Sequence, residues 1–207
     1  MYIVFEGMVG SGKSTQSKKL FEYLQEKYPD RKIIHVREPG STIIAQEIRL
    51  LAQSRVFEEE MDPICEAYLY AASRAQSLRH LVRPTLEAGG IVIADRSFIS
   101  SLAYQGEARG LGLDRIMEIN QHAVEGVLPD MVIHLYGDIE HSLARTFDAT
   151  GDKFEKMGRD FFEKVNAGYY KASQLPELVK VWRCVDGRGT IEGVFERIRG
   201  EIDRELL

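Results

Sequence analysis

The sequence has little cysteine, no long apolar run and no excess of positive charge, and each shortage excludes a class of protein. Its only two cysteines, Cys65 and Cys184, are far apart and outside any CxxC pair, so neither a zinc site nor a disulfide framework is expected. No segment approaches the roughly 18 apolar residues that a membrane span needs, and no signal-peptide pattern opens the chain. We therefore expect a cytoplasmic protein without a membrane partner.

The charge balance excludes a further class. Lysine and arginine number 27 against 32 acidic residues, a net charge of −5, which argues against a protein whose task is to bind nucleic acid. Apolar residues make up 44% of the chain and charged residues 29%, as in ordinary folded proteins. With 207 residues and no repeat or linker, the sequence predicts a single domain over residues 1–207.

Short β-branched runs alternate with helical patterns along the whole chain. The predicted strands are Tyr2–Glu6, Lys32–Val36, Ile91–Asp95, Met131–Tyr136 and Val179–Val185. The predicted helices lie near Lys13–Tyr28, Thr42–Gln53, Pro63–Ala88, Leu113–Glu125, Asp138–Phe147, Arg159–Ser173 and Thr190–Leu206. Strands separated by helices pair in parallel through right-handed crossovers. The pattern predicts an α/β fold with a five-stranded parallel sheet flanked by helices.

The longest helix is predicted over Pro63–Ala88. Asp62 precedes it as an N-cap, Pro63 suits the first turn, and a glycine pair follows its end. A period of 3.6 residues places the expected core stripe at Ile64, Tyr68, Ala71, Ala75, Leu78 and Val82.

The strongest motif follows the first predicted strand and opens the first helix. It fits G-x-x-x-x-G-K-[ST] and runs Gly7, Met8, Val9, Gly10, Ser11, Gly12, Lys13, Ser14, with Thr15 next. Glycines let successive backbone N–H groups turn inward around an anion, and the helix N-terminus adds its positive dipole end. Lys13 would neutralise the β- and γ-phosphates, and Ser14 would bind Mg²⁺. This motif predicts a binding site for a nucleoside triphosphate.

Charged residues stand at the ends of two more predicted strands. Arg37 follows one strand, and Asp95 and Arg96 end another. Ligands of open α/β sheets lie beyond the carboxyl ends of the strands, so these residues and Lys13 should share one crevice. Lys13, Arg37 and Arg96 together carry more positive charge than one triphosphate requires, which indicates a second, phosphate-bearing substrate. Asp95 is a candidate for the Mg²⁺ shell, the alternative being a structural Asp95–Arg96 ion pair.

Tyr70, Arg74 and Ser77 share one face of the long helix, about 100° from the expected core stripe. An aromatic ring beside a guanidinium suits a planar heterocycle with carbonyl acceptors. The helix pattern alone favours the simpler alternative, a tyrosine at the edge of the core and a solvated arginine.

Four motifs in this order resemble those of the thymidylate kinase family. They are FEGMVGSGKST (Phe5–Thr15), REPGST (Arg37–Thr42), YLYAASR (Tyr68–Arg74) and DRSFISSLAYQGEARG (Asp95–Gly110). The resemblance covers essentially the whole chain and implies a P-loop nucleoside monophosphate kinase fold with a lid, here near residues 148–157. It also implies transfer of the γ-phosphoryl group of Mg-ATP to dTMP, giving dTDP for dTTP synthesis, by an enzyme that is commonly a homodimer.

The resemblance further implies roles for single residues. Arg37 and Arg96 would hold the 5′-phosphate of dTMP, and Tyr70 would stack on thymine. Arg74 would reach a base carbonyl. Of the remaining contacts, Ser101 and Gln105 would read the base edge, and Tyr104 would lie against the deoxyribose.

The chain departs from the family pattern at three places. Val9 stands where the family usually has an acidic residue that binds the sugar 3′-hydroxyl, and Ser41 replaces a glycine. The phosphate loop has no catalytic arginine, which leaves Arg145 and Lys153 of the lid region as candidate transition-state cations. The other candidate catalytic residues are Lys13, Arg96 and Asp95.

Two alternatives stay open at this stage. The Val9 departure allows a kinase of another nucleoside monophosphate. A nucleotide-dependent switch or binding module is a more distant alternative, because a GTPase switch would be expected to carry an N-K-x-D motif and the sequence has none.

Overall fold

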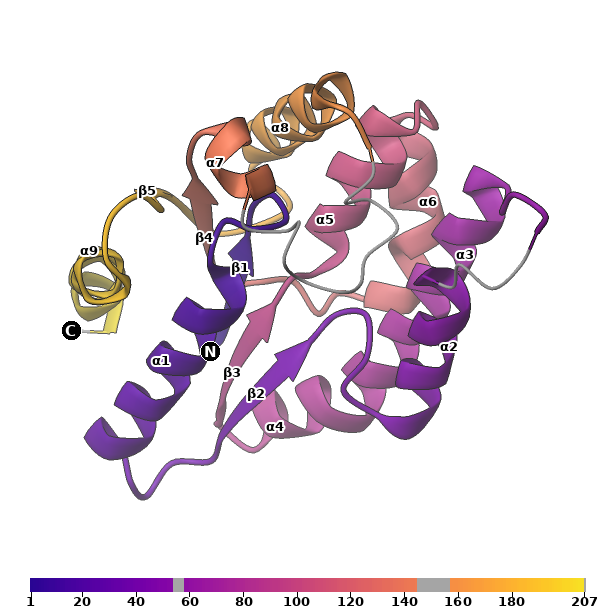
Figure 1. Cartoon of the computed structure of the whole chain (residues 1–207). Coiled ribbons are helices and arrows are strands. Elements are labelled where there is room, and N and C mark those ends of the chain that lie inside the picture. The colour runs from indigo at the N-terminus through magenta and orange to yellow at the C-terminus, as the bar shows by residue number, and fades with distance from the viewer. Residues whose placement is uncertain (54–57, 145–156, 207) are drawn as a thin grey trace.

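The computed structural model describes residues 1–53, 58–144 and 157–206, and its centre is a sheet of five parallel strands in the order β2-β3-β1-β4-β5 (Figure 1). The strands are β1 (Tyr2–Glu6), β2 (Ile33–Arg37), β3 (Ile91–Asp95), β4 (Met131–Tyr136) and β5 (Val181–Asp186). The predicted fold class is confirmed, and β1, β3 and β4 have the predicted bounds. Strand β2 lies one residue later than predicted, and β5 begins only at Val181, which pairs with the first residue of β4.

Helices connect and cover the strands. They are α1 (Lys13–Lys27), α2 (Ile43–Gln53), α3 (Pro63–Ser77), α4 (Arg83–Glu87), α5 (Phe98–Ser101), α6 (Leu113–Val124), α7 (Ile139–Ala144), α8 (Arg159–Ser173) and α9 (Ile191–Leu206). Two π-helical segments, η1 (Leu78–Val82) and η2 (Leu102–Ala108), continue α3 and α5. The long helix predicted over Pro63–Ala88 is therefore α3, η1 and α4 in succession. The sequence did not predict the helical stretch of α5 and η2. Most of this stretch is buried, so it has no solvent-exposed face that would give its sequence an amphipathic pattern.

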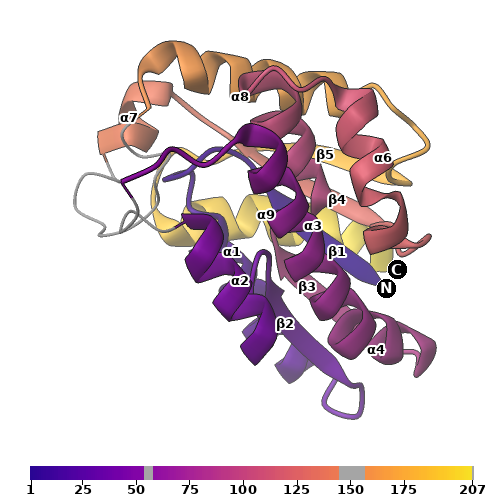
Figure 2. The same ribbon diagram turned by 90° about the vertical axis from the view of Figure 1, so that its right-hand side faces the viewer.

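Alternate residues of the strands point to opposite faces of the sheet and belong to two separate hydrophobic cores. Tyr2 and Val4 of β1 pack with the helical layer that contains α3, α5, α6 and α8. Ile3 and Phe5 point to the opposite face and pack with α1 and α9. Figures 1 and 2 show α1 and α9 on one face of the sheet and the larger helical layer on the other. The sheet is thus covered on both sides, as the apolar strands predict.

The core stripe predicted for α3 is wrong at its second position. Tyr68 is 58% exposed, whereas Ala71, Leu78 and Val82 are buried as expected. The residues that α3 buries are instead largely polar: Glu66, Ala67, Tyr70, Ala71, Ser73, Arg74 and Ser77. A count of apolar side chains misplaces the buried face of α3, because many of the side chains on that face are polar and form hydrogen bonds with other buried polar groups.

The strand order places one edge of the sheet in a special position. The chain reaches β3 on one side of β1 and β4 on the other, so the strand order reverses at β1. The loops after β1 and β3 meet at the carboxyl ends of the strands, where open α/β sheets bind ligands.

None of the described helices is both long and apolar enough to cross a membrane.

Candidate functional site

The loop between β1 and α1 has the backbone that the glycine motif predicts. Gly7 has φ of 139° and Gly12 has φ of 93°, a region that side chains rarely allow. A Cβ at Gly7 would also collide with the carbonyl of Leu135 on β4. The loop therefore closes over the end of the sheet and leads directly into the N-terminus of α1.

Lys13 is buried inside this loop. Its Nζ donates to the carbonyl of Met8 and to Ser11 Oγ, the latter at 3.2 Å. Burial, together with the charge of Arg96, lowers the pKa of Lys13 to about 7. A desolvated ammonium interacts strongly with an anion, since little water screens it.

Asp95, at the end of β3, faces the start of α1. Its Oδ2 lies 2.5 Å from Ser14 Oγ, and no described residue bonds its buried Oδ1. Burial would raise the pKa of Asp95, but the charges of Lys13 and Arg96 and the hydroxyl of Ser14 outweigh it and lower the pKa. The pair offers an ionised carboxylate and a hydroxyl, the hard oxygen donors that Mg²⁺ prefers. The described residues contain no group of three acidic, histidine or cysteine ligands, so phosphates or water would complete such a shell.

Arg96 joins the phosphate loop to the rest of the site. Its Nη1 donates to the carbonyl of Gly7 at 3.2 Å, to Ser100 Oγ at 3.0 Å and to Tyr169 Oη at 3.2 Å. Its φ of 76° is strained for a residue with a side chain, a feature that clusters at functional sites. Asp95 forms an ion pair with Arg37 Nε at 3.9 Å, whereas the guanidinium of Arg96 is directed to the loop and the cleft.

A buried carboxylate beneath the loop was not anticipated from the sequence. Glu6 Oε1 accepts from Ser97 N and Oγ, both at 2.8 Å, and its Oε2 accepts from Ser100 Oγ and Tyr169 Oη at 2.6 and 3.0 Å. Tyr169, on α8, also donates to the carbonyl of Gly7 at 3.1 Å. The position of Glu6 at the end of a buried strand was an available signal, but nothing local marks Tyr169.

A cleft with about 360 Å³ of unfilled space opens beside the loop. Its lining contains the predicted Tyr70, Arg74, Arg96, Ser101, Tyr104 and Gln105. Glu38, Pro39, Gln53, Ser97 and Ser100 also line it and were not singled out from the sequence. Arg37 lies outside this lining, with its side chain 57% exposed. The structure thus brings most of the predicted acceptor residues to one place.

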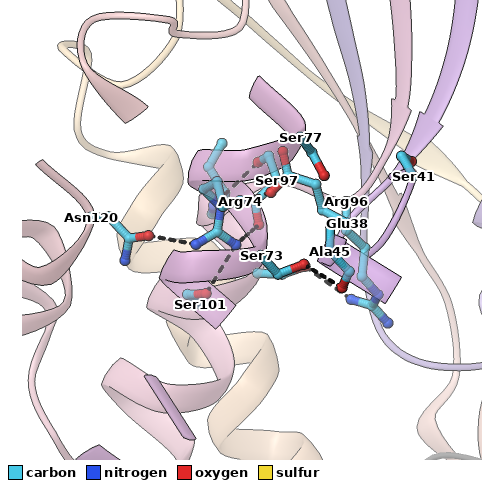
Figure 3. Close-up of polar contacts among 12 residues, drawn as sticks. Glu38, Ser41, Ala45, Ser73, Arg74, Ser77, Arg96, Ser97, Ser101 and Asn120 are labelled. Carbon is cyan, nitrogen blue, oxygen red and sulfur yellow. Dashed lines mark hydrogen bonds and ion pairs between the residues drawn. The ribbon is translucent and has the colours of Figure 1, made fainter. Parts of the chain in front are cut away.

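Arg74 is the centre of a buried polar network at this cleft (Figure 3). Its Nε donates to Glu38 Oε2 at 2.7 Å, and its Nη1 donates to Asn120 Oδ1. Its Nη2 donates to Ser97 O and to Ser101 Oγ, each at 3.2 Å. These contacts use four of the five guanidinium hydrogens and leave one Nη1 hydrogen without a partner among the described residues. The solvated arginine considered as the simpler alternative is therefore wrong.

The structure shows what surrounds Val9, which stands where the family usually has an acidic residue. The Val9 side chain packs against the core, and its backbone N–H donates to Tyr104 Oη at 3.2 Å. Arg96 lies over the ring of Tyr104, 5.2 Å from its centroid. The phosphate loop is therefore tied to the cleft through Tyr104 without an acidic residue at position 9.

Ser41 occupies a left-handed conformation with φ of 76°, which explains why glycine suits this position. Its hydroxyl compensates by accepting from Arg37 N at 2.6 Å and donating to Arg37 O at 2.9 Å. Serine thus closes the turn that positions Arg37.

The predicted lid, residues 148–157, lies outside the described residues except for Met157, and so do the candidate cations Arg145 and Lys153. Their roles stay predictions.

The chain is similar to proteins of one family over its whole length. A family model described as thymidylate kinase matches residues 5–198. A thymidylate kinase of Thermosipho melanesiensis is 39% identical over 206 residues, covering 100% of this chain and 99% of that protein. One of Finegoldia magna is 40% identical over 201 residues, covering 95% of each. The crystal structure of a thymidylate kinase from Ehrlichia chaffeensis matches with a TM-score of 0.78 and 26% identity over 98% of both chains.

Proposed function

The chain belongs to the thymidylate kinase family, and from that premise we propose which of its residues carry the reaction. Members of the family phosphorylate dTMP to dTDP with ATP, and this is the activity of the chain. The comparisons favour neither the kinase of another nucleoside monophosphate nor the nucleotide-dependent switch.

We place ATP on the loop from Gly7 to Thr15, with Lys13 at its β- and γ-phosphates. The support is the buried ammonium of Lys13 and the inward-turned glycine backbone. Mg²⁺ would be held by Ser14 and Asp95, whose oxygens are 2.5 Å apart, and it would supply charge neutralisation at the phosphates.

We place dTMP in the cleft beside the loop. Arg96 and the more exposed Arg37 would hold its phosphate, and Tyr70 would stack on thymine, with Arg74, Ser101, Tyr104 and Gln105 around the nucleoside. One observation carries this proposal: Arg96 donates to the Gly7 carbonyl of the ATP loop and also lines the cleft. One guanidinium therefore spans the two substrates.

Transfer would proceed by positioning and charge stabilisation. The attacking oxygen belongs to a phosphate that is already ionised near neutral pH, so no strong general base is needed. Lys13 would stabilise the transferring group while Arg96 holds the acceptor in line. Arg145 and Lys153 are proposed as the lid cations that close over the phosphates and exclude water, within a single kinase domain of residues 1–207 whose lid is near 148–157.

The proposed function is tested by ADP release from Mg-ATP with dTMP, dUMP, dCMP, dGMP, AMP and UMP as acceptors. A strong preference for dTMP supports it and shows that Val9 is compatible with dTMP recognition. A preference for another acceptor, or hydrolysis indifferent to all six, contradicts it.

We also propose a homodimer that forms through α2 and α3. Ile43 and Leu50, and likewise Ile44 and Leu51, are seven residues apart and so share one side of α2. They are 44–85% exposed, and Tyr68 of the neighbouring α3 is 58% exposed. Such an apolar helix face is typical of an interface. Sedimentation should give a dimer for the wild type and a monomer for Leu50→Glu; a monomeric wild type contradicts the proposal.

A cytoplasmic location is proposed as well. Cys65 and Cys184 are both exposed and unpaired, as suits a reducing compartment.

A further inference from the structure

Glu66, on the buried face of α3, points a carboxylate at the π-helical segment η2. The residue is completely buried. Gln105 Nε2 donates to its Oε1 at 2.8 Å, and Arg109 Nη2 donates to its Oε2 at 3.2 Å. The carboxylate is paired with a cation and acts only as an acceptor.

This contact fixes the orientation of the Gln105 amide. The reverse orientation would bring the amide oxygen against a carboxylate oxygen, two acceptors without a hydrogen between them. Arg109 holds the other oxygen of Glu66, so the carboxylate keeps Oε1 on the Gln105 side. Gln105 lines the cleft, and no described residue donates to its Oε1. The NH₂ of this amide is thus occupied by Glu66, and its oxygen is the group left to accept from a ligand of the cleft.

Arg74 supplies the complementary group. Its contacts with Glu38, Asn120, Ser97 and Ser101 leave one Nη1 hydrogen, and Arg74 lines the same cleft. A donor and an acceptor together match a base with a carbonyl beside a ring N–H, as in thymine. Cytosine offers the opposite pair, an amino group beside a bare ring nitrogen.

We propose that Glu66 is a positioning residue that sets base specificity by forcing Gln105 to accept rather than donate. The inference rests on the proposed placement of the dTMP base in this cleft. Glu66 touches no substrate and acts entirely through the amide of Gln105.

The test compares kcat/KM for dTMP and dCMP, with Mg-ATP, in wild type, Glu66→Gln, Gln105→Met and the double variant. The amide introduced by Glu66→Gln keeps an oxygen toward Arg109 and turns its NH₂ toward Gln105, which then presents its own NH₂ to the cleft. The dTMP/dCMP ratio should fall at least about tenfold, with dCMP gaining in absolute kcat/KM. Gln105→Met should also lower the ratio, and Glu66→Gln should add nothing in that background.

The control is Glu118→Gln, an exposed carboxylate on α6, which should leave both substrates unchanged. A purely structural Glu66 would lower both kcat/KM values in parallel and leave the ratio intact, which overturns the proposal. An unchanged ratio in Gln105→Met overturns it as well. If Glu66→Gln fails to fold, Glu66→Met, which frees the Gln105 amide from its acceptor partner, must lower the ratio, and an unchanged ratio there is decisive against the proposal. A wild type inactive with dTMP would contradict the proposed function instead.

Discussion

The phosphate end and the acceptor end of the site are built in different ways. The phosphate end is the backbone of one continuous loop, Gly7 to Gly12, with Lys13 folded into it. The acceptor end consists of side chains from the loop after β2 and from α3, α5, η2 and α6 that converge on Arg74 and on Gln105. The first depends on local conformation, whereas the second exists only after the sheet and helices have packed.

This difference separates chemistry from stability. The glycines and Lys13 of the loop bear on the transferring phosphate and add no apolar side chain to the core. Residues of the buried network neutralise one another, so a change in one leaves its partner unpaired and destabilises the fold. Four substitutions can break or sharpen the contrast.

Lys13→Ala should have the largest effect. Loss of the ammonium at the transferring group should lower kcat by at least about 10³-fold. The free energy of unfolding should not fall, because burial disfavours the charge of Lys13 in the folded state. Steady-state kinetics and urea unfolding measure both, with the exposed Lys18→Ala on α1 as control. Near-normal kcat would refute the role given to Lys13.

Glu38→Gln should instead act mainly on stability. It leaves the buried guanidinium of Arg74 without its carboxylate, which costs about 4 kcal/mol of unfolding free energy. Glu163→Gln removes the exposed partner of Arg159 and should change the urea midpoint very little. Equal midpoints for the two variants would mean that the acceptor network is not what holds this end together.

His134 on β4 gives a pH test beneath the phosphate end. Burial lowers the pKa of His134 to about 4, so the unfolded chain binds more protons between pH 6.5 and 4. Stability should therefore fall as the pH drops through this window, by as much as roughly 3 kcal/mol. His134→Phe keeps an aromatic ring against Tyr169 and should make this acid loss smaller. Identical pH profiles for wild type and variant would exclude His134 as its source.

Tyr169→Phe should produce the smallest change and tests whether α8 positions Arg96. The ring stays, but the hydroxyl that contacts Arg96, Glu6 and Gly7 is lost. We expect kcat to fall about tenfold with a nearly unchanged melting temperature. Tyr170→Phe, at the exposed neighbouring position, should be neutral. A fall in melting temperature with normal kcat would assign Tyr169 to packing alone.

The same contrast explains what could be predicted from the sequence. The loop from Gly7 to Ser14 is contiguous in sequence, and its conformation requires particular residue types. Its position, and the fact that α1 begins at its end, can therefore be predicted from the sequence. The alternation of strands and helices likewise predicts the sheet, because burial on both faces requires apolar strands.

At the acceptor end, such reasoning reached only the strand-end arginines and the face shared by Tyr70 and Arg74, and the other predicted residues came through family resemblance. The buried face of α3 carries Glu66, Ser73 and Arg74, so an apolar stripe through Tyr68 misplaces it. Asn120 and Tyr169 come from helices distant in sequence, and only packing shows that they meet Arg74 and Arg96. Polar networks inside a fold have no local period to reveal them.

The separation of the two ends is tested most directly by calorimetric titration of Lys13→Ala with dTMP. If the cleft alone binds the acceptor, the Kd for dTMP should stay within about twofold of the wild-type value although turnover is lost. A Kd that rises together with the loss of turnover would show that the loop and the cleft form one binding unit, and would contradict the account.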